Sequence, residues 1–270
     1  MKTCAFIGLG SQGAPMARRM IHAGYPVRLW ARRRETLDAF SDTDATIASS
    51  ITEVGQAQHV GICVVDDRGV QEICDALIPV MQPGGLIAIH STVDPRLCIS
   101  LAQLAAVRGI ALIDAPVSGG GPAASAGKLT VMVGGDKAAV DAARPVFETF
   151  SSLIAHLGTV GTGQMAKLVN NALMAAHVAI ADHALSAAAA LNIDRAAFIE
   201  LVKASSGRSF GFEVYSRQAS PQAFAHGAKL LAKDIHLLGE SLSSHAGFEA
   251  LKELTTPFLR LATQTFGDTA

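Results

Sequence analysis

Short apolar runs alternate with longer stretches of helical periodicity through the first half of the chain. The spacing of apolar positions predicts helices over Gln12–Ala23, Val70–Met81, Asp94–Arg108 and Lys137–Phe150. Apolar runs of strand length separate them, and these predicted strands are Thr3–Ile7, Val27–Trp30, Val60–Val65, Leu86–His90, Ala111–Asp114, Thr130–Val133 and Leu153–Leu157. Strands that alternate with helices of this length are typical of βαβ units, so we expect a mainly parallel sheet.

The pattern changes after Gly158. The glycines between Gly158 and Gly163 predict a short hinge, and no Gly or Pro then interrupts the helical pattern of Gln164–Leu191. At about 1.5 Å per residue this helix would be roughly 42 Å long, which exceeds the width of a small domain. We therefore expect it to join two domains.

The remainder of the chain, Asp194–Phe266, keeps a helical periodicity. Breaks are expected at Ser205–Gly211, Ser220–Pro221 and Thr256–Pro257, where turn-forming residues occur. The sequence thus predicts an α/β domain over residues 1–158 and an all-α domain over residues 159–270, joined by the long interdomain helix.

The composition is that of a protein with a large buried core. Half of the residues are hydrophobic and 17% are charged, which excludes an intrinsically disordered chain. Lys and Arg total 22 and Asp and Glu total 23, so the chain has no excess of basic residues for binding nucleic acid. The cysteines Cys4, Cys63, Cys74 and Cys98 form no C-x-x-C pair and have no His cluster beside them. This spacing predicts reduced thiols in a cytoplasmic protein and no metal site.

The most apolar long stretch, Ala172–Leu191, contains His177, Asp182 and His183. Because a helix in lipid rarely contains three such groups, we expect a buried helix and no membrane partner. The two histidines and the aspartate have no further ligand one helical turn away, so we expect them to serve packing and not catalysis.

A glycine-rich loop follows the first predicted strand and opens the first predicted helix. It fits G-x-G-x-x-G, the fingerprint of a dinucleotide site in this context. The first glycine allows a tight turn, the second lets a pyrophosphate approach, and the third lets the helix pack closely. The helix N-terminus offers free N–H groups to the phosphates. The loop residues expected to bind the cofactor are Gly8, Leu9, Gly10, Ser11, Gln12 and Gly13.

The end of the second predicted strand distinguishes NAD from NADP. An NAD site places Asp or Glu there, to bind the ribose hydroxyls. This chain instead has Ala31, Arg32, Arg33 and Arg34, and the first acid is Glu35. Guanidinium groups bind phosphate through planar, charge-assisted hydrogen bonds. We therefore expect Ala31, Arg32 and Arg33 to line a 2′-phosphate site, with NADP preferred over NAD.

Four motifs in this order resemble the β-hydroxyacid dehydrogenases, a family that includes 3-hydroxyisobutyrate dehydrogenase, tartronate semialdehyde reductase and the glyoxylate/succinic semialdehyde reductases. They are the glycine loop, Asp114–Gly120 continuing to Gly127–Gly135, the G-x-x-x-K-x-x-x-N pattern of Gly163, Lys167 and Asn171, and the pair Lys233-Asp234. The likeness covers nearly the whole chain. The chain departs from the family at Gln12, where Met is usual, and at Gly121-Pro122, in a loop that varies between members.

The resemblance implies an α/β Rossmann domain, a long connecting helix, an all-α domain and assembly as a homodimer or homotetramer. It also implies roles for individual residues. Lys167 would be the catalytic general acid and Asn171 would hold the substrate or the lysine. The substrate carboxylate would be bound by Ser118, Gly119 and Gly120. The remaining cofactor contacts implied are Thr92 near the nicotinamide ribose, Val64 and Val65 at the adenosine side, and Lys233 at the nicotinamide end.

The residues themselves are compatible with these roles. Lys167 and Asn171 are four apart on the predicted long helix, so they share one face. Ser118–Gly120 follows the strand Ala111–Asp114, at the carboxyl edge where α/β sheets bind ligands. An NADPH-dependent semialdehyde reductase, or hydroxyacid dehydrogenase in reverse, is the leading hypothesis. An imine reductase of the same architecture and a non-catalytic scaffold are the alternatives, and both usually lack a lysine at position 167.

Overall fold

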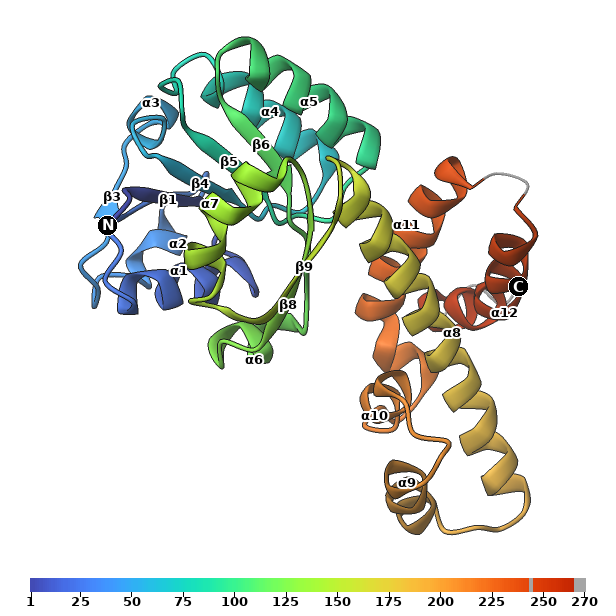
Figure 1. The fold of residues 1–270 in the computed structure, drawn as a ribbon. Helices are drawn as coiled ribbons and strands as arrows, with labels where there is room; N and C mark the ends of the chain where they lie inside the picture. The colour runs from blue at the N-terminus through green and yellow to red at the C-terminus, as the bar shows by residue number, and fades with distance from the viewer. Residues whose placement is uncertain (243–244, 265–270) are drawn as a thin grey trace. The chain divides into compact units, whose positions relative to one another are not determined.

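The computed structural model describes residues 1–242 and 245–264 (Figure 1). They form two compact units, Met1–Lys167 and Leu168–Ala270, and the boundary lies within one long helix. An N-terminal α/β unit is therefore followed by a helical unit, which confirms the predicted fold class.

Within the described residues, nine strands of the first unit form one sheet in the order β3-β2-β1-β4-β5-β6-β8-β7, with β9 paired to β8. The pairs from β3 to β6 are parallel, whereas β8 pairs antiparallel with β6 and β7. The strands are β1 Cys4–Ile7, β2 Val27–Trp30, β3 Thr46–Ile47, β4 His59–Ile62, β5 Leu86–Ile89, β6 Ala111–Asp114, β7 Val117–Ser118, β8 Leu129–Gly134 and β9 Ser151–Gly158.

Helices cover both faces of this sheet. Apolar side chains of α1 and α7 belong to one core cluster, and those of α4 and α5 belong to the other. Figure 1 shows where these four helices lie along the sheet. Because both faces are covered, β1, β4 and β5 are buried along their whole length and show no polar alternation. The helices of this unit are α1 Gly13–His22, α2 Glu35–Asp38, α3 Ile51–Val54, α4 Asp67–Leu77, α5 Pro95–Val107, α6 Gly120–Ser125, α7 Lys137–Phe147 and the start of α8 Thr162–Ala190.

The second unit contains the rest of α8 and a set of shorter helices. Its core forms where Leu168, Ala172 and Ala175 of α8 meet apolar residues of the later helices. These are α9 Arg195–Ala204, α10 Phe210–Tyr215, the 3-10 helix η1 Pro221–Phe224, α11 Ala225–Ser241 and α12 Ala246–Thr263. By length and composition α8 would suffice to cross a membrane, and 44% of its most apolar window is buried inside the fold.

The predicted break at Thr256–Pro257 is wrong, because Pro257 lies inside α12. A proline removes one backbone donor and normally interrupts a helix. Here the Thr256 hydroxyl donates to the Lys252 carbonyl at 2.7 Å, and Phe258 and Leu259 on the same turns are buried in the core. Tertiary packing therefore outweighs the local cost of the proline.

Several element ends also differ from the sequence prediction. The strand predicted over Val60–Val65 is β4, which ends at Ile62, and the helix predicted over Lys137–Phe150 is α7, which ends at Phe147. The short elements α2, β3, α3, β7 and α6 were not predicted. The strands β3 and β7 have only two residues each, and the helices α2, α3 and α6 are shorter than two helical turns, too short to show a 3.6-residue period.

The cysteines Cys4, Cys74 and Cys98 are buried, Cys63 is half-buried, and all four are free thiols. Burial raises the pKa of the Cys4, Cys63 and Cys74 thiols to about 12. These thiols are therefore protonated at neutral pH and poorly nucleophilic.

Candidate active site

The three glycines of the G-x-G-x-x-G loop are each required for a different reason. Gly8 has φ +93°, and a side chain there would overlap the Cys63 carbonyl. A Cβ on Gly13 would overlap the Gly8 carbonyl oxygen, so helix α1 can pack this closely only on glycine. Gly10, in contrast, has no atom within 4 Å of its Cβ position. The loop thus leaves open space beside Gly10, which is where a pyrophosphate has to approach the backbone.

A pocket of about 500 Å³ opens beside this loop in the first unit. It is formed by the glycine loop, the residues after β2 and the residues after β4. The predicted cofactor residues that line it are Gly8, Leu9, Gly10, Ala31, Arg32, Arg33, Val64 and Val65. Ser11, Gln12, Gly13, Thr92 and Lys233 do not line it. Its size and its hydrogen-bond donors suit the adenosine and phosphate part of a dinucleotide, the cofactor that the glycine loop implies.

Thr36 and Asp66 are among the lining residues that the sequence prediction missed. Thr36 lies just after the arginines, and Asp66 caps helix α4 by accepting a hydrogen bond from Gly69 N at 2.9 Å. A cap of the type Asp-x-x-Gly before a helix is visible in the sequence, but nothing local shows that it faces the glycine loop.

Arg32 forms an ion pair that sequence reasoning also missed. Its guanidinium contacts Glu72 at 2.7 Å, and Glu72 also accepts from Arg68 at 2.8 Å. The hydrogen bond from Arg68, followed by the attraction of both guanidinium groups, lowers the pKa of the Glu72 carboxyl. An acid therefore faces the predicted 2′-phosphate site from helix α4, forty residues further along the chain.

The predicted substrate loop lies against the glycine loop. Gly119 has φ +127° and Gly120 has φ +71°, conformations that other residues rarely adopt. A Cβ on Gly121 would lie 2.7 Å from the Ser11 carbonyl oxygen, so the loop backbone packs directly on the cofactor loop. Ser118 is half-buried at the end of β7 and Gly119 is exposed. The first unit therefore brings the predicted carboxylate site beside the predicted dinucleotide site.

Lys167 and Asn171 lie one turn apart on α8, as their spacing predicts. Lys167 is buried, with 9% of its surface exposed. The Asn171 amide donates to the Asp234 carboxylate at 2.6 Å, and Asp234 is buried in α11 beside Lys233. Asp234 thus fixes the orientation of Asn171 within the second unit, a role that the Lys233-Asp234 motif did not indicate.

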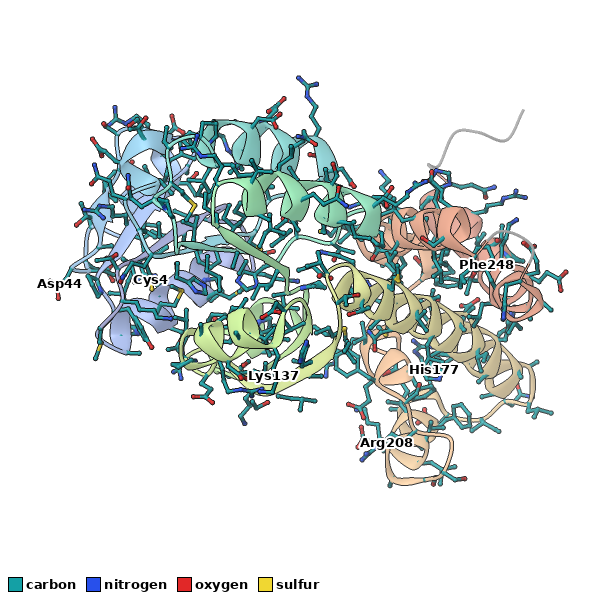
Figure 2. The ribbon with its side chains drawn as sticks, turned by 45° about the horizontal axis from the view of Figure 1, so that its top comes forward. Cys4, Asp44, Lys137, His177, Arg208 and Phe248 are labelled. Carbon is teal, nitrogen blue, oxygen red and sulfur yellow. The ribbon has the colours of Figure 1, made fainter. Side chains whose placement is uncertain are left out.

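Two polar residues further along α8, Asp182 and His177, are engaged in contacts within the second unit, whereas His183 is exposed. Asp182 accepts a hydrogen bond from the Tyr215 hydroxyl at 2.6 Å. His177, labelled in Figure 2, lies so close to Gly211 that a Cβ on Gly211 would come within 2.5 Å of the histidine Cβ. Among the described residues, no group of three or more His, Cys, Asp or Glu side chains is placed to hold a metal ion.

Comparisons with known proteins identify the family. Residues 3–158 match the NAD binding domain of 6-phosphogluconate dehydrogenase, and residues 161–269 match the NAD-binding domain of NADP-dependent 3-hydroxyisobutyrate dehydrogenase. An NAD-dependent L-serine dehydrogenase of Pseudomonas aeruginosa is 34% identical, over 97% of this chain and 92% of its own length. The chain belongs to the β-hydroxyacid dehydrogenase family.

Other β-hydroxyacid dehydrogenases are similar along more than nine-tenths of their length. A 3-hydroxyisobutyrate dehydrogenase of Pseudomonas aeruginosa is 30% identical, over 98% of this chain and 91% of its own length. The solved structure of Mycobacterium tuberculosis 3-hydroxyisobutyrate dehydrogenase with L-serine has a TM-score of 0.85 and 25% identity, and the match covers 98% of this chain and 94% of that one. The β-hydroxyacid dehydrogenase architecture is therefore present from the glycine loop to α12.

Proposed function

We propose that this β-hydroxyacid dehydrogenase is an NADP(H)-dependent oxidoreductase that interconverts a small hydroxyacid and its aldehyde or semialdehyde. The observation that supports this most directly is the contact of the substrate loop with the glycine loop, at Gly121 and Ser11. This contact supports a carboxylate site beside a dinucleotide site within one unit. Relatives named L-serine dehydrogenase and 3-hydroxyisobutyrate dehydrogenase support a small hydroxyacid as the substrate class.

The residues present fit a bound nicotinamide dinucleotide. Gly8, Gly10 and the first turn of α1 would hold its pyrophosphate, and Val64 and Val65 would line its adenosine side. When bound, the dinucleotide supplies or accepts the hydride at the substrate carbon. Backbone N–H groups of the Ser118–Gly120 loop and the Ser118 hydroxyl would bind the substrate carboxylate.

Lys167 performs the proton transfer in this proposal. In the reductive direction its ammonium group stabilises the negative charge that develops on the substrate oxygen and then donates a proton to it. In the oxidative direction the neutral amine accepts the hydroxyl proton. The presence of this lysine also disfavours an imine reductase or a non-catalytic scaffold.

The preference for NADP rests on Arg32 and Arg33, which line the pocket with no acid at position 31. The family model for the second half is named for an NADP-dependent enzyme, whereas the L-serine dehydrogenase relative is named as NAD-dependent. In our proposal a 2′-phosphate takes the place of Glu72 as the partner of Arg32.

The proposed assembly is a homodimer or homotetramer in the cytoplasm. Val169, Leu173 and Ile180 leave an exposed apolar stripe on α8, which supports contact with another copy. Sedimentation analysis of the purified protein tests this, and a monomer at micromolar concentration would contradict it.

A substrate panel tests the activity. It contains L-serine, 3-hydroxyisobutyrate, glyoxylate and succinic semialdehyde, each assayed with NADP(H) and with NAD(H) by absorbance at the nicotinamide band. We expect turnover with at least one acid and a higher kcat/KM with the phosphorylated cofactor. Absence of turnover with the whole panel would contradict the proposed activity, and a higher kcat/KM with NAD(H) would contradict the cofactor assignment.

A further inference from the structure

A buried carboxylate holds the start of α8 onto the sheet. Asp114, the last residue of β6, is fully buried. Its two oxygens accept hydrogen bonds from Gly161 N and Gln164 N, both at 2.7 Å. The first N–H groups of a helix have no partner within the helix, so Asp114 provides one from a neighbouring strand. The predicted glycine hinge is therefore tied to β6.

Glycines make room for this carboxylate. A Cβ on Gly134 would lie 2.5 Å from Asp114 Oδ1, and one on Gly163 would lie 2.9 Å from Oδ2. Gly163 is the first residue of the G-x-x-x-K-x-x-x-N motif. Its small size is thus required for the helix to approach β6 and not only for chain flexibility.

The side chain of Gln164 forms a second attachment, to the segment after β5. Gln164 is fully buried. Its Oε1 accepts from Val93 N at 3.2 Å, and its Nε2 donates to the Ser91 carbonyl at 2.7 Å. Both polar ends of one amide therefore bond the backbone on either side of Thr92. Thr92 is the residue that the family resemblance places near the nicotinamide ribose.

The same segment is also bonded to the cofactor pocket. The Ser91 hydroxyl accepts a hydrogen bond from Val64 N at 2.8 Å, and Val64 lines the pocket beside the glycine loop. A continuous set of hydrogen bonds thus runs from the pocket through Ser91 and Gln164 to the first turn of α8. Lys167 lies three residues after Gln164, on the adjoining turn of that helix.

We propose that Gln164, held by Asp114, is a positioning residue that fixes the Thr92 segment and the Lys167 turn relative to each other. This inference rests on the proposed function. Hydride transfer requires the nicotinamide side of the cofactor, and proton transfer requires Lys167. Both groups must therefore be correctly positioned around the same substrate molecule. Gln164 connects the two backbones that present them, although it contacts no reacting atom itself.

The variant Gln164→Met tests this, because methionine matches the length of glutamine and forms neither hydrogen bond. Ser151→Ala is the matched control, since it also removes one buried hydrogen bond from the first unit, that from the Ser151 hydroxyl to the Phe147 carbonyl at 2.8 Å. For Gln164→Met we expect a kcat loss of about a hundredfold, the size associated with misplacement of reacting groups by about 1 Å. The Kd for NADPH should change by less than about threefold, which is under about 1 kcal/mol.

The kinetic isotope effect separates positioning from simple loss of folded protein. With NADPH deuterated at the transferred position, a slower hydride transfer raises the isotope effect on kcat. A reduced folded fraction lowers kcat and leaves the isotope effect unchanged. An isotope effect and a kcat like those of the Ser151→Ala control would overturn the proposal.

Hydrogen exchange provides a readout that needs no substrate. In Gln164→Met, peptides that contain Val93 and peptides that contain Gly161–Lys167 should both exchange faster, whereas Ser151→Ala should alter neither. Unchanged exchange at Val93 would overturn the attachment itself. Absence of wild-type turnover with the whole panel would instead refute the proposed function, and the exchange result would remain interpretable.

Discussion

Lys167 has 9% of its surface exposed, although lysine side chains are usually held in solvent. The proposed chemistry depends on the amine of this buried side chain. Lys167→Ala should lower kcat by about 10²–10⁴-fold, the usual contribution of general acid catalysis. Lys167→Arg should restore little, because a guanidinium with a pKa above about 12 gives up its proton poorly.

Single-turnover hydride transfer and a direct NADPH titration provide the measurement for Lys167. The exposed lysine Lys137, labelled in Figure 2, supplies the control Lys137→Ala, which should keep full activity. A Lys167→Ala enzyme that turned over within about tenfold of wild type would contradict the general-acid role, since that is only about 1.4 kcal/mol of barrier.

Ser118 should affect binding more than chemistry. Its hydroxyl would contact the substrate carboxylate in the ground state and in the transition state alike. Ser118→Ala should therefore raise KM more than it lowers kcat. Steady-state kinetics with the best acid of the panel measures both, with the exposed Ser125→Ala as the control. An unchanged KM with a collapsed kcat would assign Ser118 to the chemical step.

Arg32 and Arg33 should determine the choice of cofactor. The loss of one charge-assisted phosphate contact costs about 1.5–3 kcal/mol, so the double change to alanine should lower NADPH affinity by at least about tenfold to hundredfold. NADH affinity should change little. Fluorescence titration with both cofactors is the measurement, and Arg34→Ala, outside the pocket, is the control. Equal losses for the two cofactors would mean that the arginines do not recognise the 2′-phosphate.

Sequence reasoning predicted the residues whose role is local. The conformations of Gly8, Gly10 and Gly13 follow from a strand, a turn and a helix start, all encoded within ten residues. It could not predict Glu72 beside Arg32 or Gln164 beside Val93, because these partners are brought together only by the packing of distant segments.

Helix α7 contains both a side-chain cap and an exposed ion pair. We expect the cap to contribute more than the ion pair to the free energy of unfolding. Asp136 accepts a hydrogen bond from Ala138 N at 2.9 Å, and Lys137 pairs with Asp141 at 2.5 Å on the exposed face. Asp136→Ala should lower the free energy of unfolding by about 1 kcal/mol. Asp141→Ala should lower it by less, because solvent screens an exposed ion pair. Denaturant unfolding of both variants provides the comparison, and the reverse order would contradict it.

At the level of elements, the strands of four or more residues and the helices of ten or more were largely predictable, whereas the two-residue strands and the helices of four to six residues were not. β2 and β6 have the bounds that their apolar runs predict. α12 shows the opposite case, since its proline predicts a break that its buried face overrides. Local propensity decides an element only where tertiary packing does not oppose it.

Two buried histidines make the stability of the first unit depend on pH. Burial lowers the pKa of His59 to about 3 and that of His90 to about 4. His90 Nδ1 forms a hydrogen bond with the Ala115 carbonyl at 2.8 Å, whereas His59 Nδ1 has no hydrogen-bond partner among the described residues. Above pH 6.5 both rings are neutral in the folded and unfolded chain, so the full stability is present. Between pH 6.5 and about 4 only the unfolded chain gains these protons, and stability is lost.

The melting temperature should therefore fall as pH decreases from 6.5 to 4. His59→Leu removes one of the two groups and should flatten this dependence, with little cost at pH 7.5 because no hydrogen bond of Nδ1 is lost. The exposed His236→Leu is the control. Thermal unfolding across this pH range is the measurement, and identical slopes for wild type and His59→Leu would contradict the assignment.

The hydrogen bonds of Asp114 also determine when the first unit can finish folding during synthesis of the chain. As the protein leaves the ribosome from its N-terminus, the whole sheet, through Gly158 of β9, emerges before Gly161 and Gln164 do. Until those two amides arrive, the carboxylate at the end of β6 has to remain hydrated or take up a proton, because an unpartnered charge is costly to bury. The last strand is thus insufficient to complete the first unit, and the nascent chain completes it only with the first turn of α8, the helix that continues into the second unit.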